Sequence, residues 1–144
     1  MSVFNSMQIS ASGLTLERLK MDTISTNIAN VNTTRTEEGG PYLKKEVVFE
    51  ENLVDEKNKL TGTLEKRSMG VKVVGIEDNQ DNTKLVYDPD HPDADENGYV
   101  TMPNVNMVDE MIALINAQRS YDANVTALNA SKGMLKKALE ISKG

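Results

Sequence analysis

The chain has 144 residues, of which 38% are hydrophobic and only 4% aromatic, and its formal net charge is −6. This composition does not predict a large single core, and the negative charge argues against a nucleic-acid-binding protein and against attachment to an anionic membrane surface. The absence of cysteine excludes disulfides, thiolate metal sites and cysteine nucleophiles.

The first segment is predicted to form an amphipathic helix. Apolar residues recur every three or four positions, with one interval of seven across Glu17 and Arg18. Gly13 weakens the helix locally, and the pattern ends in the asparagine-rich stretch 27–34. The apolar stripe consists of Phe4, Met7, Ala11, Leu14, Met21, Ile24, Ile28 and Val31.

The middle of the chain loses this helical period. Four short runs are rich in β-branched and aromatic residues and are bounded by Gly, Asn, Asp or Pro, which predicts strands. These runs are Lys44–Glu50, Val71–Glu77, Thr83–Tyr87 and Tyr99–Met102. The segment Glu51–Arg67 is charged and weakly patterned, so we interpret it as a loop or an edge hairpin.

The last segment is predicted to form a longer helix, with Asn106 and Asp109 resembling a capping box at its start. At 1.5 Å per residue it would be about 55 Å long, too long for so small a chain to cover. Its apolar side must therefore meet another long helix, in this chain or in a neighbour. That stripe consists of Met107, Met111, Leu114, Tyr121, Val125, Leu128, Leu135 and Leu139, widened near its start by Val108, Ile112 and Ile115.

This order of elements predicts an α+β fold, in which long N- and C-terminal helices form a coiled-coil-like pair with a small β unit between them. We expect residues 1–34 and 104–144 to supply the two helices of the coiled-coil domain, and residues 35–103 to form a small β-rich domain with loops. Amides beside the apolar stripes are either a solvated polar face or, as we favour, determinants of register and partner choice, because an unpaired buried amide is costly. The expected assembly interface is Leu14, Met21, Ile24, Asn27, Ile28, Asn30, Met111, Leu114, Gln118, Arg119, Tyr121, Val125 and Leu128.

An acidic loop is the strongest candidate for a ligand site. Asp93–Gly98 fits the first half of an EF-hand loop, DxDxNG, but the twelfth position is Asn104, where a bidentate Glu is needed. We therefore expect an Asx-rich turn that binds Ca²⁺ no tighter than about millimolar. His91, the single histidine, lies in this loop without a nucleophile or a second ligand. We predict no enzyme activity, no metal site and no cofactor.

Two motifs in the terminal segments resemble a known family. Asn27-Ile-Ala-Asn-Val-Asn-Thr-Thr34 and Gln118-Arg-Ser-Tyr-Asp-Ala-Asn124 are similar to the helix motifs of the bacterial flagellar axial proteins. Thr34–Phe49, Gly70–Val74 and Tyr87–Asn106 resemble the basal-body rod proteins more specifically, and those of the proximal rod most of all. The resemblance covers nearly all of the chain except Glu51–Arg67.

The resemblance implies a structural, non-enzymatic subunit of the basal-body rod. Its terminal helices would assemble with other rod proteins and with further copies of itself into the hollow drive shaft that transmits torque. The chain would reach the basal body through the flagellar type III export apparatus, without a cleaved signal peptide. The first ten residues lack the basic and continuous apolar regions of such a peptide, and no apolar run approaches the ~20 residues that span a bilayer. The alternative function is a soluble helical-hairpin adaptor with a β insert, and a weaker one is a metal-dependent enzyme that uses His91.

Overall fold

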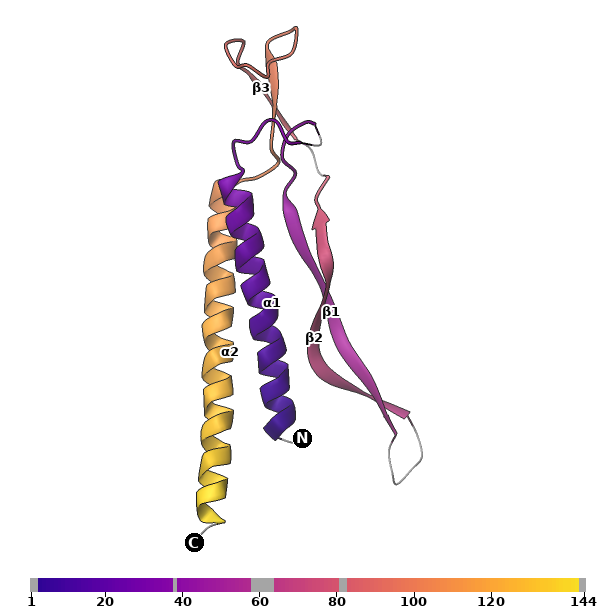
Figure 1. The fold of residues 1–144 in the computed structure, drawn as a ribbon, viewed down its shortest axis with the longest axis vertical. Coiled ribbons are helices and arrows are strands. Elements are labelled where there is room, and N and C mark those ends of the chain that lie inside the picture. The colour runs from indigo at the N-terminus through magenta and orange to yellow at the C-terminus, as the bar shows by residue number, and fades with distance from the viewer. Residues whose placement is uncertain (1–2, 38, 58–63, 81–82, 143–144) are drawn as a thin grey trace. The chain divides into compact units, whose positions relative to one another are not determined.

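The computed structural model describes residues 3–37, 39–57, 64–80 and 83–142 (Figure 1). Two helices, α1 (Val3–Ala29) and α2 (Met107–Ile141), lie at the two ends of the chain. Between them come the strands β1 (Lys45–Lys57), β2 (Leu64–Asp78), β3 (Lys84–Tyr87) and β4 (Tyr99–Met102). The predicted α+β class, with a small β region between two long helices, is confirmed.

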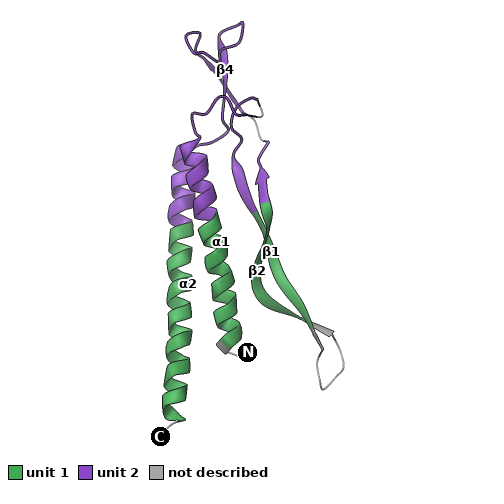
Figure 2. Ribbon diagram, in the orientation of Figure 1, with its two compact units in different colours: residues 1–19, 48–75, 117–144 green, residues 20–47, 76–116 purple. Residues whose placement is uncertain are grey.

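The chain divides into two compact units, and each is built from segments that lie far apart in the sequence (Figure 2). Unit 1 contains residues 1–19, 48–75 and 117–144, and unit 2 contains residues 20–47 and 76–116. The helices and the two longer strands therefore contribute to both units, whereas β3 and β4 belong to unit 2 alone.

In unit 1, α1 and α2 lie side by side and run in opposite directions. The hydroxyl of Ser6 on α1 lies 3.5 Å from that of Ser131 on α2. Seven residues further along α1, a Cβ placed on Gly13 would lie 2.9 Å from Nδ2 of Asn124, which is seven residues back along α2. Gly13 does not interrupt α1, and its missing side chain lets the two helices approach closely.

The face of α2 that is covered in unit 1 follows a heptad. Intervals of four and three alternate along residues that are all buried or half-buried, as in a coiled-coil seam. They are Ala117, Tyr121, Asn124, Leu128, Ser131 and Leu135. The seam mixes apolar with small polar side chains, so it is less hydrophobic than the stripe that the sequence predicts.

Strand β2 packs against α1 at Gly70. This residue is buried and has φ +104°, a conformation that favours glycine. A Cβ at this position would overlap Oγ of Ser12 and lie 3.2 Å from Cα of Ile9. The Ser12 hydroxyl accepts a hydrogen bond from the Val71 amide at 3.1 Å and donates one to the Ile9 carbonyl at 2.7 Å. One serine thus ties the strand to the helix.

The pair β1–β2 forms a two-stranded sheet that is longer than expected. The segment interpreted as a loop or an edge hairpin is strand as far as Lys57 and again from Leu64, so the hairpin alternative is correct for these parts. Residues 58–63 of that segment lie outside the described residues. Since both faces of a two-stranded sheet reach solvent, charged side chains do not prevent strand formation here.

Unit 2 contains the second two-stranded sheet, the end of α1 and the start of α2. Strands β3 and β4 pair antiparallel, with Tyr87 opposite Tyr99 and Val86 opposite Val100. Val100 is only 2% exposed. Helix α2 is capped by Asn106, whose Oδ1 accepts the Val108 amide at 3.1 Å, as the sequence predicts.

The apolar core is small. Among the described residues, the buried hydrophobic side chains are Leu16, Tyr42, Val100, Val105 and Ala117. Asparagine, threonine, serine and glutamate side chains are buried as well, so polar contacts carry much of the specificity of the fold.

Candidate functional site

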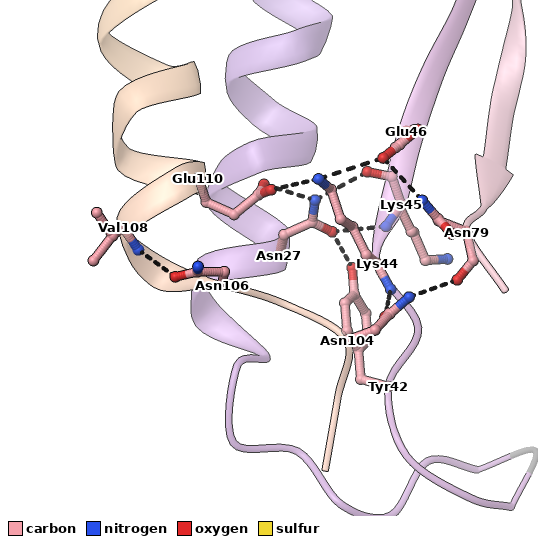
Figure 3. A network of polar contacts seen from close by, with 10 residues as sticks. All are labelled: Asn27, Tyr42, Lys44, Lys45, Glu46, Asn79, Asn104, Asn106, Val108 and Glu110. Carbon is pink, nitrogen blue, oxygen red and sulfur yellow. Dashed lines mark hydrogen bonds and ion pairs between the residues drawn. The ribbon is translucent and has the colours of Figure 1, made fainter. Parts of the chain in front are cut away.

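Asn27 is the centre of a buried polar network in unit 2 (Figure 3). Its side chain is 1% exposed and makes four hydrogen bonds. Oδ1 accepts the Tyr42 hydroxyl and the Lys45 amide, both at 2.9 Å. Nδ2 donates to the Lys45 carbonyl at 2.9 Å and to Oε2 of Glu110 at 3.0 Å. All the donors and acceptors of this amide are satisfied, so α1, β1 and α2 are joined through one side chain.

Glu110 brings a buried charge to this network, and Lys44 neutralises it. The two side chains approach to 2.9 Å, and that of Glu110 is only 3% exposed. A buried carboxylate is tolerated only when it is paired and hydrogen-bonded, and here Lys44 and Asn27 supply both requirements. Glu46 lies 3.3 Å from the same ammonium group.

The surroundings shift two pKa values in this network. Burial raises the pKa of the Tyr42 hydroxyl, and the charges of Asp78 and Glu110 raise it further. Burial by itself lowers the pKa of Lys44, but the hydrogen bonds and negative charges of Glu110 and Glu46 outweigh it, so the net pKa is raised. Both groups therefore keep their protons at neutral pH.

A second amide holds the residue just before β1. Oδ1 of Asn104 accepts the Lys44 amide, and Nδ2 of Asn104 donates to the Asn79 carbonyl, each at 2.8 Å. The Asn79 amide in turn donates to the Lys44 carbonyl at 2.7 Å. Two asparagine side chains thus fix consecutive backbone amides, Lys44 and Lys45, at the start of the long sheet. The arrangement is a structural joint between the start of β1, Asn79 and Asn104.

The first turns of α2 carry an apolar patch on the side away from this network. Val108, Ile112 and Ile115 lie at positions i, i+4 and i+7, and at 3.6 residues per turn they point away from Glu110 and Leu114. Their exposed fractions are 64%, 53% and 50%. With Met107 and Met111, which are also exposed, they form what we call the α2 patch. Exposed apolar clusters are typical of surfaces that bind a partner.

The structure places the residues of the expected interface in three environments. Asn27 is fully buried, and Met111, Gln118 and Arg119 are exposed. The remaining nine are half-buried: Leu14, Met21, Ile24, Ile28, Asn30, Leu114, Tyr121, Val125 and Leu128. Ile24 lines a shallow groove with Asn27 and Glu110. The Asn30 amide bonds the Thr26 carbonyl at 2.9 Å and accepts the Thr33 hydroxyl at 3.1 Å, so it caps the end of α1.

Sequence reasoning missed the partners of Asn27. The sequence pattern predicts Lys44 only as the first residue of a strand and assigns no site role to Tyr42 or Glu110. The sequence does contain a signal for Glu110, because this residue stands one heptad, seven residues, before Ala117 at the start of the α2 seam. A charged residue at a seam position implies a buried partner. The partners of Glu110 are Asn27, 83 residues away on α1, and Lys44, just before β1. Sequence spacing does not reveal either of them.

The acidic loop forms an Asx turn, as the sequence favours. Oδ1 of Asp95 accepts the amides of Asn97 and Tyr99 at 2.9 and 2.8 Å, and Gly98 has φ +81°. Oδ2 of Asp93 accepts the Thr34 hydroxyl at 2.8 Å. Nδ1 of His91 accepts the Asp93 amide at 3.1 Å.

Among residues 3–37, 39–57, 64–80 and 83–142, no three His, Cys, Asp or Glu side chains converge as metal ligands. Neither helix has, in its described part, an apolar stretch long enough to cross a bilayer.

Comparison with known proteins matches the chain to flagellar rod proteins over its whole length. Residues 7–35 match the family model "Flagella basal body rod protein", and residues 96–141 match "Flagellar basal body rod FlgEFG protein C-terminal". The flagellar basal-body rod protein FlgC of Borreliella burgdorferi is 43% identical and covers 100% of both chains. FlgC of Bacillus subtilis is 45% identical, covering 99% of this chain and 100% of its own. FlgC of Escherichia coli O157:H7 is 39% identical over 98% of both chains.

Proposed function

We propose, from the premise that this chain belongs to the FlgC family of flagellar basal-body rod proteins, that it builds the rod through helix faces left uncovered in the isolated chain. The chain is a structural subunit of the bacterial flagellar basal-body rod. We further propose that its terminal helices pack against other rod proteins and against further copies of itself. They would thereby form the inner tube of the hollow shaft that transmits torque.

The α2 patch is the observation that carries this proposal. The contact between the two helices of the chain uses polar side chains, among them Asn27 and Glu110. Its larger apolar side chains on the first turns of α2 stay exposed on the other side of the helix. Full burial of one such side chain contributes about 1.5–3 kcal/mol, so covering the patch would strongly favour assembly.

The residues of the expected assembly interface fit this division of roles. Met111, Gln118 and Arg119 are exposed on α2 and available to a neighbour. Asn27 supports assembly indirectly, because it holds the end of α1, the start of α2 and the start of β1 together. Residues 1–34 and 104–144 would then supply the assembling helices, and residues 35–103 an outer β-rich domain.

The proposed route to the basal body is export across the inner membrane by the flagellar type III apparatus, without a cleaved signal peptide. The protein would have no catalytic activity and would bind no nucleic acid. A small core and a fold held by a few buried polar contacts suit a chain that must be unfolded for passage and refold afterwards.

A complementation experiment tests the assembly proposal. A strain that lacks the gene for this protein is given the wild-type chain, Met111→Asp or Ile115→Asp, with Asn129→Asp on an exposed polar position of α2 as the matched control. We expect wild type and the control to restore motility and rod-containing basal bodies. The two patch variants should fold normally, because both positions are exposed, yet fail to build a rod. Full motility with both patch variants would refute the role of the α2 patch and favour a soluble adaptor.

A further inference from the structure

The α2 patch contains two methionines that are open to solvent. Among the described methionines, Met107, Met111 and Met134 are exposed, with fractions of 41%, 48% and 60%. The other described methionines are half-buried: Met7, Met21, Met69 and Met102. The chain has no cysteine, so methionine thioethers are its only sulfur atoms. A sulfur-directed oxidant therefore finds two of its accessible targets in the surface on which the proposed assembly depends.

Met111 lies next to three other members of the patch. Residues three and four positions apart on a helix are neighbours on its surface. Met107 and Val108 precede Met111 by four and three residues, and Ile115 follows it by four. A polar group at Met111 would therefore stand directly beside Met107, Val108 and Ile115.

Hydrogen peroxide converts an exposed thioether into a sulfoxide. The sulfur attacks one oxygen of the peroxide, the O–O bond breaks, and the second oxygen leaves as water. The sulfur is oxidised by two electrons, and the peroxide is reduced by the same two. Because the oxidant reaches the sulfur from solvent, exposed methionines react faster than half-buried ones.

A sulfoxide is incompatible with an apolar contact at the α2 patch. Its oxygen is a hydrogen-bond acceptor, and covering an acceptor without supplying a donor is unfavourable. Val108, Ile112 and Ile115 have aliphatic side chains and offer no donor. Oxidation would leave the fold of the free chain unchanged, because both thioethers are exposed there, but it would oppose the covering of the patch.

We propose that Met107 and Met111 are oxidation sites, that their conversion to sulfoxides keeps the chain out of the rod, and that assembly covers and protects them. This inference rests on the proposed function, because it takes the α2 patch to be covered on assembly. The patch would then admit a subunit to the rod only while both thioethers are reduced.

Peptide mass spectrometry tests the chemistry of the two sites. The purified full-length chain and isolated basal bodies are treated with the same concentration of hydrogen peroxide, and the gain of one oxygen atom is followed at each methionine. In the free chain, Met107 and Met111 should react several-fold faster than the half-buried methionines, and in basal bodies they should react more slowly than in the free chain. Reaction no faster than that of the half-buried methionines, or no slower in basal bodies, would overturn the inference.

Polar substitution tests whether the modification prevents assembly. In the deletion strain, the pair Met107→Gln and Met111→Gln places an uncharged polar group where the sulfoxides would be, and Met134→Gln is the matched control outside the patch. We expect the glutamine pair to build about tenfold fewer rods than the control. Equal numbers of rods would refute the inference.

A pulse of hydrogen peroxide during rod growth tests the sites in the cell. Rods are counted with and without the pulse in each strain, so every variant serves as its own reference and oxidation of other proteins affects all strains alike. The pair Met107→Leu and Met111→Leu should lose a smaller fraction of its rods than wild type, whereas Met134→Leu should lose the same fraction as wild type. Equal fractional losses in all three strains would contradict the inference.

The outcome for the proposed function is separate. If the glutamine pair builds rods normally while Met111→Asp does not, the α2 patch keeps its role in assembly and only the oxidation inference fails. If Met111→Asp and Ile115→Asp also build rods, the role of the patch itself is refuted.

Discussion

Replacing Asn27 by aspartate should destabilise unit 2 in a pH-dependent way. The change is nearly isosteric, but it converts Nδ2 from a donor into an acceptor oxygen. That oxygen would face the Lys45 carbonyl at 2.9 Å and Oε2 of Glu110 at 3.0 Å, where hydrogen bonds now exist. Two acceptors at such distances repel each other, and a second carboxylate would be buried beside Glu110.

The size of the effect has an upper bound. The introduced carboxyl can bind a proton instead of remaining charged, and from an ordinary Asp pKa of about 3.9 this costs about 4 kcal/mol at pH 7. A protonated carboxyl offers one donor where the amide offered two, so one hydrogen bond of about 1 kcal/mol is lost as well. The loss at pH 7 is therefore at most about 5 kcal/mol, comparable with the whole stability of many small domains.

The pH dependence provides the diagnostic measurement. The pKa of the new carboxyl is higher in the folded than in the unfolded chain, so folding requires the uptake of a proton. This uptake costs less free energy as the pH falls, and the stability deficit therefore shrinks. Between about pH 7 and pH 5 the deficit should decrease by up to about 2.7 kcal/mol, two units at 1.36 kcal/mol each. Urea unfolding followed by circular dichroism measures this, with Asn32→Asp at an exposed position as the matched control. Equal stability of the two variants at pH 7, or a deficit that does not change with pH, would refute the role assigned to the Asn27 amide.

The contacts at Gly70, Tyr42 and the acidic loop, and the stability of the two terminal helices, can be tested in the same way. Gly70→Ala should loosen the packing of β2 on α1, because its Cβ would overlap Oγ of Ser12; faster hydrogen exchange in Val71–Glu77 than in wild type measures this, and unchanged exchange would contradict it. Because folding raises the pKa of Tyr42, the contribution of this hydroxyl to stability is constant below about pH 10 and decreases above it. In urea unfolding, Tyr42→Phe should therefore lose less stability than wild type between about pH 8 and pH 11, and equal losses would contradict this. Calorimetry should find Ca²⁺ binding at Asp95 no tighter than about millimolar, since the Asx turn already uses this carboxylate; micromolar binding would revive a regulatory role. In dilute monomer, hydrogen exchange should be fast in both terminal helices and slower in Val71–Glu77, and strong protection of both ends would favour a closed helical hairpin.

The sequence predicts the elements well because their signals are local. The 3.6-residue period identifies both helices, the Asn106 cap marks the start of α2, and β-branched runs mark all four strands. The two longer strands extend beyond the prediction because their distal parts are charged. A two-stranded sheet with solvent on both faces tolerates such residues, whereas composition alone suggests a loop.

The side of each helix that is buried within the chain is harder to predict. On α1, the apolar stripe contains Leu14 and Met21, but the more deeply buried residues are Leu16 and Thr23, two positions further along each time. Hydrophobicity indicates which residues are favoured to leave water, but it does not indicate whether the covering surface belongs to the same chain or to a neighbouring subunit. The intrachain contact uses small and polar side chains, whose hydrogen-bonding partners come from distant elements such as Glu110.

The antiparallel contact between the two helices also determines when the chain can fold. The partners Ser6 and Ser131 are separated by 125 residues, and Asn27 and Glu110 by 83. Contacts of such sequence separation form only after a large loop-closure entropy has been overcome, and they make folding slow. During synthesis, α1 can meet Lys45 and Val71 well before α2 emerges, but its contacts with Glu110, Asn124 and Ser131 must wait for α2. The helix pair is therefore the late-forming part of the fold, and the contacts of α1 with β1 and β2 are the ones that can form early.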